Sequence, residues 1–311
     1  MKEKTRNILS VAVFLFGFLL SAYPLISGLV ERQYQKNAVA TYRKEAAAVE
    51  KTDTEQVLSD ARQYNSLLYQ TENMVVEEVS GTILGEESYQ KQLNVTGTGV
   101  MGSIDIPKIN VSLPIYHGTG EDVLSSGAGH LEGSSLPVGG KNTRTILTGH
   151  RGLPNSKLFT RLDELEEGDL FYLNVLDETL AYRVNDIRVI DPEDTDSLKI
   201  EPEKDLATLI TCTPYGINTR RLVVTGERVE YVKAEHDAIK GERMSLRELV
   251  FALIPFAFLA AAGLRGLFAY RRKRKQEGRE KQGDSVPESA KQPETKQNFY
   301  LNSQEKRRLK L

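Results

Sequence analysis

The residue of this chain best suited to chemistry is its single cysteine, Cys212, which ends the apolar run LATLITC. One cysteine excludes an internal disulfide framework, and it also excludes a zinc site built on two or four cysteines. Free cysteines are often buried for packing alone, so a structural role is the alternative. The run reads as a buried strand, however, and the end of a strand would place the sulfur at the mouth of a barrel. We therefore interpret Cys212 as a candidate nucleophile.

A cysteine nucleophile needs a partner that sustains its thiolate, and histidine is the usual one. The chain has four histidines, which are His117, His130, His150 and His236. We expect His236, in a polar linker, to be solvated. The other three lie at or near strand ends, so spacing alone does not choose among them. His150, at the end of TRTILTGH, mirrors the placement of Cys212 best.

Acyl transfer also requires a donor for the developing oxyanion. Arg221 begins the strand that follows the Cys212 loop, so a β-hairpin would bring the two residues side by side. Its guanidinium is permanently charged and supplies several donors. The neighbouring Arg220 would point to the opposite face and is expected to make a salt bridge at the rim. A rim salt bridge is the alternative for Arg221 as well.

The elements that must position these residues begin at Gly97, where Gly and Pro become frequent and short β-rich runs appear. The candidate strands are 100–106, 111–116, 143–148, 169–175, 180–190, 206–211 and 221–231. Many short strands in about 135 residues favour a closed or nearly closed β-barrel. We also expect one helix within residues 155–165, with Leu158, Phe159, Leu162 and Leu165 on its apolar face.

Two apolar stretches frame the chain. Residues 8–30 carry no charge and follow three basic residues, and residues 249–264, extending to Tyr270, precede five basic residues. Each is long enough to cross a bilayer, and the flanking basic residues favour two cytoplasmic termini with about 31–245 outside the cell. The alternatives are a cleaved signal peptide for the first and a buried helix for the second. An exposed thiol outside the cell has nothing to keep it reduced, so a cysteine retained there suggests a functional role.

The net charge of −2 hides an asymmetry, because residues 271–311 carry 13 basic and 6 acidic residues. A nucleic-acid patch is one interpretation of this tail, but its position directly after an apolar stretch favours contact with lipid. Beyond about residue 276 we expect disorder. Residues 32–78 show apolar positions at helical spacing, which predicts one or two amphipathic helices that act as a spacer.

The run TLITC followed by TPYGINTRRLVV resembles the signature of sortases, the membrane-anchored cysteine transpeptidases of Gram-positive bacteria. Four upstream runs are similar to the pilus-assembling subgroup, class C: GVMGSIDIPKINVSLPIYHGT, GHLEGSSLPVGG, TILTGHRGLP and KLFTRLDEL. The resemblance covers about residues 99–231. It implies a mainly β fold, a closed eight-stranded barrel with N-terminal helices, flanked by two transmembrane helices.

The resemblance also implies roles for single residues. Cys212 matches the nucleophile, His150 the general acid and base, and Arg221 the residue that stabilises the oxyanion and orients the substrate. His117 and His130 match family positions outside this triad, so we interpret them as structural. The implied partners are pilin subunits with an LPxTG-like C-terminal signal and an acceptor lysine, together with membrane lipid. No metal, organic cofactor or nucleic acid is implied.

Two alternatives to pilin polymerisation stay open. The first keeps the chemistry but changes the acceptor, as in a sortase that anchors surface proteins to peptidoglycan or merely hydrolyses the signal. The second is a non-catalytic membrane module that binds and organises pilins, against which the complete trio of Cys212, His150 and Arg221 argues.

The sequence departs from the class C pattern in two places. Relatives in this subgroup often carry a lid with an Asp-Pro-aromatic motif, and no such motif occurs between Gln70 and Gly99. Tyr89 is a candidate for a substitute plug. Relatives also often have His at the position of Arg220, for which we expect little consequence.

These interpretations divide the chain into seven segments. They are a cytoplasmic N-terminus (1–7), a transmembrane helix (8–30), an extracellular helical spacer and lid-like region (31–96), the catalytic barrel (97–232), a linker (233–248), a second transmembrane helix (249–270) and a basic cytoplasmic tail (271–311).

Overall fold

The structure is a computed structural model that describes residues 2–73, 85–153, 156–239, 241 and 246–283. The chain forms two compact units, residues 1–255 and 256–311, and the first holds every element discussed below except most of the C-terminal helix.

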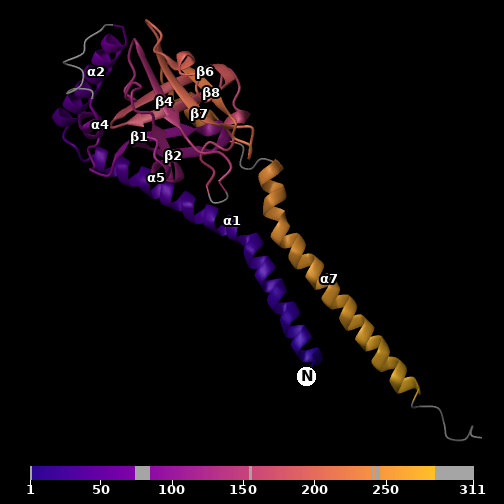
Figure 1. Cartoon of the computed structure of the whole chain (residues 1–311). Helices are drawn as coiled ribbons and strands as arrows, with labels where there is room; N and C mark the ends of the chain where they lie inside the picture. Colours follow the sequence, from indigo (N-terminus) through magenta and orange to yellow (C-terminus); the bar gives the residue numbers. More distant parts are fainter. Residues whose placement is uncertain (1, 74–84, 154–155, 240, 242–245, 284–311) are drawn as a thin grey trace, which may run out of the picture. The chain divides into compact units, whose positions relative to one another are not determined.

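The centre of the first unit is a closed barrel of eight strands in the order β1-β2-β3-β4-β7-β8-β6-β5 (Figure 1). The strands are β1 (Val100–Ile106), β2 (Val111–His117), β3 (Ala128–His130), β4 (Thr143–Thr148), β5 (Leu170–Val175), β6 (Glu178–Ile190), β7 (Asp205–Thr213) and β8 (Arg220–Val229). The expected closed barrel is confirmed. Seven strands match the predicted ones to within about two residues at each end, and β3, at three residues, was not predicted.

Short helices lie in the segments that connect or follow the strands. They are α5 (Glu121–Ser126), α6 (Lys233–Ala238) and the 3-10 turns η1 (Pro107–Ile109), η2 (Leu162–Glu164) and η3 (Asp196–Leu198).

The strands β4, β7 and β8 lie side by side and are buried on both faces. β4 and β7 run parallel, and β7 and β8 run antiparallel. Leu147, Leu209 and Val224 belong to the interior cluster, whereas Ile146, Ile210 and Val223 belong to a second cluster. A strand buried on both faces reads as a continuous apolar run, which explains the sequence LATLIT. These three strands therefore have apolar contacts on both faces.

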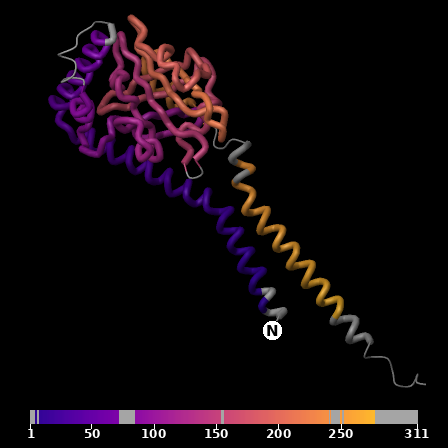
Figure 2. The backbone as a smooth tube through the Cα atoms, viewed as in Figure 1, coloured from indigo at the N-terminus to yellow at the C-terminus, as the bar shows by residue number. Residues whose placement is uncertain are grey.

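Before the barrel, the described residues form the helices α1 (Lys2–Ala46), α2 (Lys51–Asn73) and α4 (Glu86–Lys91). The Tyr42 hydroxyl of α1 donates to the Met101 carbonyl and accepts from the Leu176 amide. Leu58, Ala61 and Tyr64 of α2 join the same apolar cluster as the barrel interior. The described part of the stretch expected to act as a spacer, residues 32–73, thus packs on the barrel, as the backbone path also shows (Figure 2).

The helix expected within residues 155–165 is wrong over the residues that the structure describes. Only the single turn η2 forms there, and Leu158 has a left-handed φ of 35°. An L-residue rarely adopts that conformation, and a helix cannot continue through it. The apolar residues of the stretch are all buried in the core, so their spacing reflects tertiary burial and not a helix.

The two apolar stretches form helices. Residues 8–46 in α1 and 252–276 in the C-terminal helix α7 (Leu246–Gly283) are long and apolar enough to cross a membrane, by length and composition. α7 continues to Gly283, beyond the point at which we expected disorder. The rest of the tail, 284–311, lies outside the described residues.

Candidate active site

The ends of β4 and β7 lie at the same edge of the barrel. Thr148 pairs with Ile210 in parallel register. Just beyond, the Gly149 amide donates to the Ile210 carbonyl at 3.1 Å, and the Thr211 hydroxyl donates to the Gly149 carbonyl at 2.7 Å. His150, two residues after the end of β4, therefore lies at the level of Cys212, the last residue but one of β7, as their matched placement in the sequence predicts.

The third residue comes from the other side of β7. Cys212 pairs directly with Arg221 across the antiparallel β7–β8 ladder, and Thr213 pairs with Arg220. This confirms the predicted hairpin placement. Three neighbouring strands thus bring His150, Cys212 and Arg221 to one rim of the barrel.

Cys212 lies where β7 leaves the core. The residues from Leu206 to Thr211 are buried, whereas Cys212 and Thr213 are only partly buried. The cysteine is free. The sulfur therefore belongs to a residue held by a rigid strand yet open to solvent at the mouth, which is the placement that a nucleophile requires.

The turn that carries His150 depends on a glycine. A Cβ atom on Gly149 would lie 2.8 Å from the Phe159 ring, closer than real Cβ atoms approach. Phe159 is fully buried, and its amide donates to the His150 carbonyl at 3.2 Å. The small residue before His150 thus lets a core aromatic pack beneath the turn.

His150 has one acidic neighbour. Its Nε2 lies 3.3 Å from the Glu121 carboxylate of α5, with the His150 side chain 25% exposed and Glu121 84% exposed. The pair is not aligned as a hydrogen bond, and Nε2 has no other partner among the described residues. Sequence reasoning missed Glu121, because nothing in the run GEDVL indicates its proximity to His150.

The two arginines of β8 behave differently. Arg221 Nη1 donates to the carbonyls of Asn218 at 3.4 Å and Arg220 at 3.2 Å, which holds its guanidinium at the rim. Arg220 Nε instead lies 3.3 Å from the exposed Asp191 carboxylate, so the predicted rim salt bridge is confirmed. Arg221 makes no ion pair with an acidic side chain of the described residues, which leaves its charge available at the mouth.

His130 and His117 are locked inside the protein. His130 Nε2 donates to the Ser135 carbonyl at 2.9 Å, so its Nδ1 accepts from the Tyr89 hydroxyl at 2.9 Å. Burial lowers the pKa of His130 to about 4. His117 contacts the Gly99 carbonyl through Nδ1 and the Gln92 carbonyl through Nε2. These contacts support the structural role expected for both residues.

Tyr89 does not plug the mouth. Its ring is fully buried against His117 and His130, and its hydroxyl also accepts from the Gly118 amide at 2.9 Å. A tyrosine held by these contacts anchors α4 to the barrel wall, and the idea of a substitute plug is wrong. The greater part of the lid-like region that precedes it, residues 74–84, lies outside the described residues.

His236 differs from its expected solvated state. Its ring stacks on Tyr172 with centroids 4.0 Å apart, and its Nδ1 lies 3.3 Å from the Tyr231 hydroxyl. The polar linker after the barrel thus begins with a small aromatic cluster against β5.

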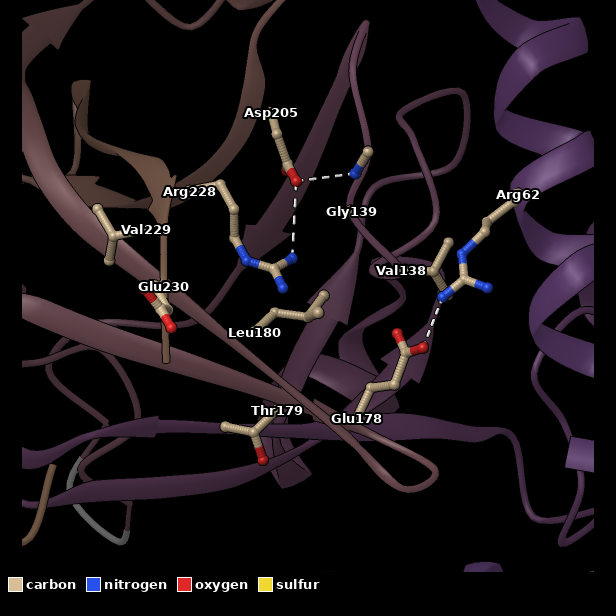
Figure 3. Close-up of a pocket in the computed structure, with 11 residues that line it drawn as sticks. Arg62, Val138, Gly139, Glu178, Thr179, Leu180, Asp205, Arg228, Val229 and Glu230 are labelled. Carbon is tan, nitrogen blue, oxygen red and sulfur yellow. Dashed lines mark hydrogen bonds and ion pairs between the residues drawn. The ribbon is translucent and has the colours of Figure 1, made fainter. Parts of the chain in front are cut away.

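An open pocket lies at the far end of β7 (Figure 3). Asp205 begins β7 there, seven residues before Cys212, which is about 23 Å along an extended strand. Its carboxylate accepts from the Gly140 amide and the Tyr182 hydroxyl, and Arg62 pairs with Glu178 at 2.6 Å. These charges are already paired, so we assign the chemistry to the opposite rim. No group of three or more His, Cys, Asp or Glu in the described part of the chain is placed to hold a metal ion.

Comparisons with known proteins agree with this geometry. The family model described as "Sortase domain" matches residues 104–229. The chain is 35% identical to Sortase D of Bacillus subtilis over 131 residues, 41% of this chain, and the match spans only 63% of that relative's length.

Among solved structures, the chain is similar to sortase C1 of Streptococcus agalactiae, with 45% identity, a TM-score of 0.58 and coverage of 63% of this chain and 100% of that one. It is also similar to Streptococcus pneumoniae sortase C, with 40% identity, a TM-score of 0.55 and coverage of 63% and 97%. The chain therefore belongs to the sortase family of cysteine transpeptidases, and the solved structures that it resembles are sortases of class C.

Proposed function

We propose that this chain is a membrane-anchored transpeptidase that cleaves an LPxTG-like sorting signal on pilin subunits and joins the subunits through lysine isopeptide bonds. The observation that carries the chemistry is the meeting of His150, Cys212 and Arg221 at one rim, from three adjacent strands. The support for pilins as substrates comes from the class C resemblance. The S. pneumoniae sortase C structure is described as informing pilin substrate specificity.

In the first half-reaction, the Cys212 sulfur attacks the carbonyl carbon of the Thr–Gly bond. The developing oxyanion is stabilised by the Arg221 guanidinium, a permanent positive charge opposite Cys212. The C–N bond then breaks, and His150 gives its proton to the leaving amine. The products are a thioester on Cys212 and a free C-terminal fragment.

In the second half-reaction, the amine of a lysine on the next subunit attacks the thioester carbonyl. The C–S bond breaks and Cys212 leaves as a thiolate, which needs no proton. His150 takes the proton that the attacking amine sheds, so the histidine returns to its starting form. One peptide bond is lost and one isopeptide bond is gained, and the reaction needs no external energy source.

The membrane part of the proposal rests on the two apolar helices. The basic residues that flank them favour a topology with both termini in the cytoplasm and the barrel outside. The substrate would then present its sorting signal at the outer face of the same membrane. Cysteine-scanning of the termini and the barrel with a membrane-impermeant thiol reagent, on a Cys212→Ala background, tests this topology. Labelling of the termini in intact cells would contradict it.

The acceptor is tested separately from the cleavage. The full chain in detergent micelles is incubated with a purified pilin that carries the sorting signal, and the products are mapped by mass spectrometry. Oligomers joined through a lysine side chain support the proposal. Products joined only to peptidoglycan stem peptides would favour wall anchoring, and released signal without a new bond would indicate hydrolysis.

The non-catalytic alternative makes a different prediction. A module that only organises pilins would leave the sorting signal intact in the same incubation. It would also bind pilins equally well after Cys212→Ala. Cleavage that disappears in that variant, with binding retained, excludes this alternative.

A further inference from the structure

A buried arginine follows His150 directly. The Arg151 side chain is only 4% exposed. Its Nη1 donates to the Thr213 hydroxyl at 3.2 Å, and its Nη2 forms an ion pair with the Asp163 carboxylate of η2. Thr213 follows Cys212, so a single guanidinium connects the residue after the histidine with the residue after the cysteine.

Further contacts join the loop after β4 to the loop after β7. The Arg151 guanidinium carbon lies 5.8 Å from the centroid of the Tyr215 ring. The Tyr215 ring also packs on Gly152, since a Cβ atom there would lie 3.1 Å from its Cε2. The β4–β7 ladder ends with the Gly149 contacts to Ile210 and Thr211. Beyond that point, Arg151 holds the loop after β4 to the last residue of β7, and Tyr215 holds it to the loop that follows β7.

Stability alone accounts poorly for this arrangement. Burying a guanidinium costs free energy that a single ion pair offsets only in part, and an apolar residue of similar size is often as stable or more so. The Arg151 Nε atom is buried with no hydrogen-bond partner among the described residues, which adds to the cost. The fork geometry of arginine, in contrast, suits it to hold two partners at a set separation.

We propose that Arg151 is a positioning residue for the transfer reaction: through Thr213, it clasps the loop that carries His150 to the end of strand β7 that carries Cys212, and so sets their separation. This inference rests on the proposed function, in which those two residues exchange the proton. Proton transfer requires donor and acceptor within hydrogen-bond reach, and a misplacement of about 1 Å can reduce the rate about a hundredfold. Arg151 itself touches no substrate in this scheme.

The chain contains a matched control. Arg161 is also a buried arginine with a side chain 4% exposed, and it forms an ion pair with Glu164 at 2.6 Å. Its Nη1 donates to the Ile109 carbonyl at 3.4 Å. Glu164 belongs to η2 and Ile109 to η1, so these two contacts lead away from the end of β7 that carries Cys212. Replacement of Arg161 should therefore cost stability without moving His150 relative to Cys212.

The experiment compares Arg151→Met, Arg151→Lys and Arg161→Met in the full chain in detergent micelles. Cleavage of a fluorogenic LPxTG peptide gives kcat and KM, and thermal unfolding gives Tm. We expect Arg151→Met to lower kcat by about tenfold to a hundredfold with KM within about twofold. Arg151→Lys, which keeps one donor, should recover part of the loss. Arg161→Met should lower Tm at least as much and leave kcat within about twofold.

If Arg151→Met does not fold, Thr213→Val tests the positioning role of Arg151 instead. It removes the hydroxyl that accepts from Arg151 and leaves the buried ion pair with Asp163 intact. We expect a lower kcat at unchanged Tm, with a loss of kcat no larger than that expected for Arg151→Met.

Failure of the inference differs from failure of the proposed function. If the unmodified chain does not cleave the peptide, or if Cys212→Ala still cleaves it, the proposed function is wrong and the inference falls with it. If the unmodified chain cleaves but Thr213→Val keeps full kcat, or Arg151→Met and Arg161→Met lose kcat in parallel with Tm, the positioning role is overturned while the function stands.

Discussion

His150 and His130 lie twenty residues apart, near the ends of the neighbouring strands β4 and β3, and their surroundings differ in every respect that matters for catalysis. His130 is fully buried, with one ring nitrogen bonded to Tyr89 and the other to Ser135. His150 is partly exposed, and its Nε2 lies 3.3 Å from the Glu121 carboxylate without a hydrogen-bond partner among the described residues. An imidazole whose nitrogens are both hydrogen-bonded to the protein cannot exchange protons with a substrate, whereas one with an unpaired nitrogen can.

The comparison extends to whole regions. The buried cluster of Tyr89, His117 and His130 ties α4 to the barrel wall and contributes to stability. The rim at the ends of β4, β7 and β8 holds Cys212 and Arg221 on rigid strands and leaves them accessible. Substitutions in the two regions should therefore separate loss of activity from loss of stability.

The largest difference in activity is expected between the variants in which His150 and His130 are each replaced by Gln. His150→Gln should lower kcat by about a hundredfold to ten-thousandfold, since it removes the group that we propose as general acid and base. His130→Gln should instead leave kcat of the folded protein within about threefold and lower the unfolding free energy by about 1–3 kcal/mol, since buried partners lose their hydrogen bonds. Peptide cleavage and urea unfolding measure the two quantities. Equal losses of activity would contradict the assignment.

The buried histidine also predicts a dependence of stability on pH. The folded-state pKa of His130 is about 4, below the 6.5 of an unfolded histidine, so the unfolded chain binds more protons between these values. This contribution to stability is complete above pH 6.5 and is lost as pH falls toward 4, by about 3 kcal/mol in all. Urea unfolding at a series of pH values should show the decline, and His130→Gln should flatten it. An unchanged slope in the variant would refute the assignment.

The two adjacent arginines offer a comparison within one strand. Arg221→Lys should lower kcat by about a hundredfold, because a lysine at the rim cannot reproduce the guanidinium donors that we propose for the oxyanion. Arg220→Lys should stay within about threefold, since an exposed ion pair contributes about 0–1 kcal/mol. Steady-state kinetics of peptide cleavage distinguishes the two. Similar losses at both positions would argue that general positive charge, rather than the placement of Arg221 opposite Cys212, is what matters.

The smallest effect is expected at Glu121. Its carboxylate is mostly exposed, so its interaction with His150 is screened by solvent. Glu121→Gln should lower kcat by about twofold to fivefold and leave Tm unchanged. Its exposed neighbour Asp122, changed to Asn, provides the control and should have no effect on kcat. A loss of a hundredfold at Glu121 would instead place this carboxylate among the essential groups.

The strands and the pairing at the rim could be predicted from local patterns. Apolar runs bounded by Gly and Pro gave seven of the eight strands, and the hairpin between Cys212 and Arg221 followed from their positions around one turn. The strand β3 was not predicted because its three residues, AGH, are too few to show a periodicity. The expected helix within 155–165 failed because tertiary burial, not helical geometry, explains the spacing of its apolar residues.

What could not be predicted are contacts between segments distant in sequence. Glu121 reaches His150 from α5, and Arg151 reaches Thr213 across 62 positions. Tyr89 is held by His130 and Gly118, so a residue that looked available as a plug is part of the core. These contacts arise only once the barrel has closed, and no local spacing encodes them.

The most direct test is to look for the covalent intermediate on Cys212. The full chain in detergent micelles is mixed with an LPxTG-containing peptide without an amine acceptor, quenched in acid and analysed by intact-mass and peptide-level mass spectrometry. We predict an adduct equal to the peptide up to its threonine, minus one water, located on the Cys212 peptide, released by hydroxylamine and absent in Cys212→Ala. Cleavage of the peptide with no adduct on Cys212, or cleavage that persists in Cys212→Ala, would contradict this assignment of the active site.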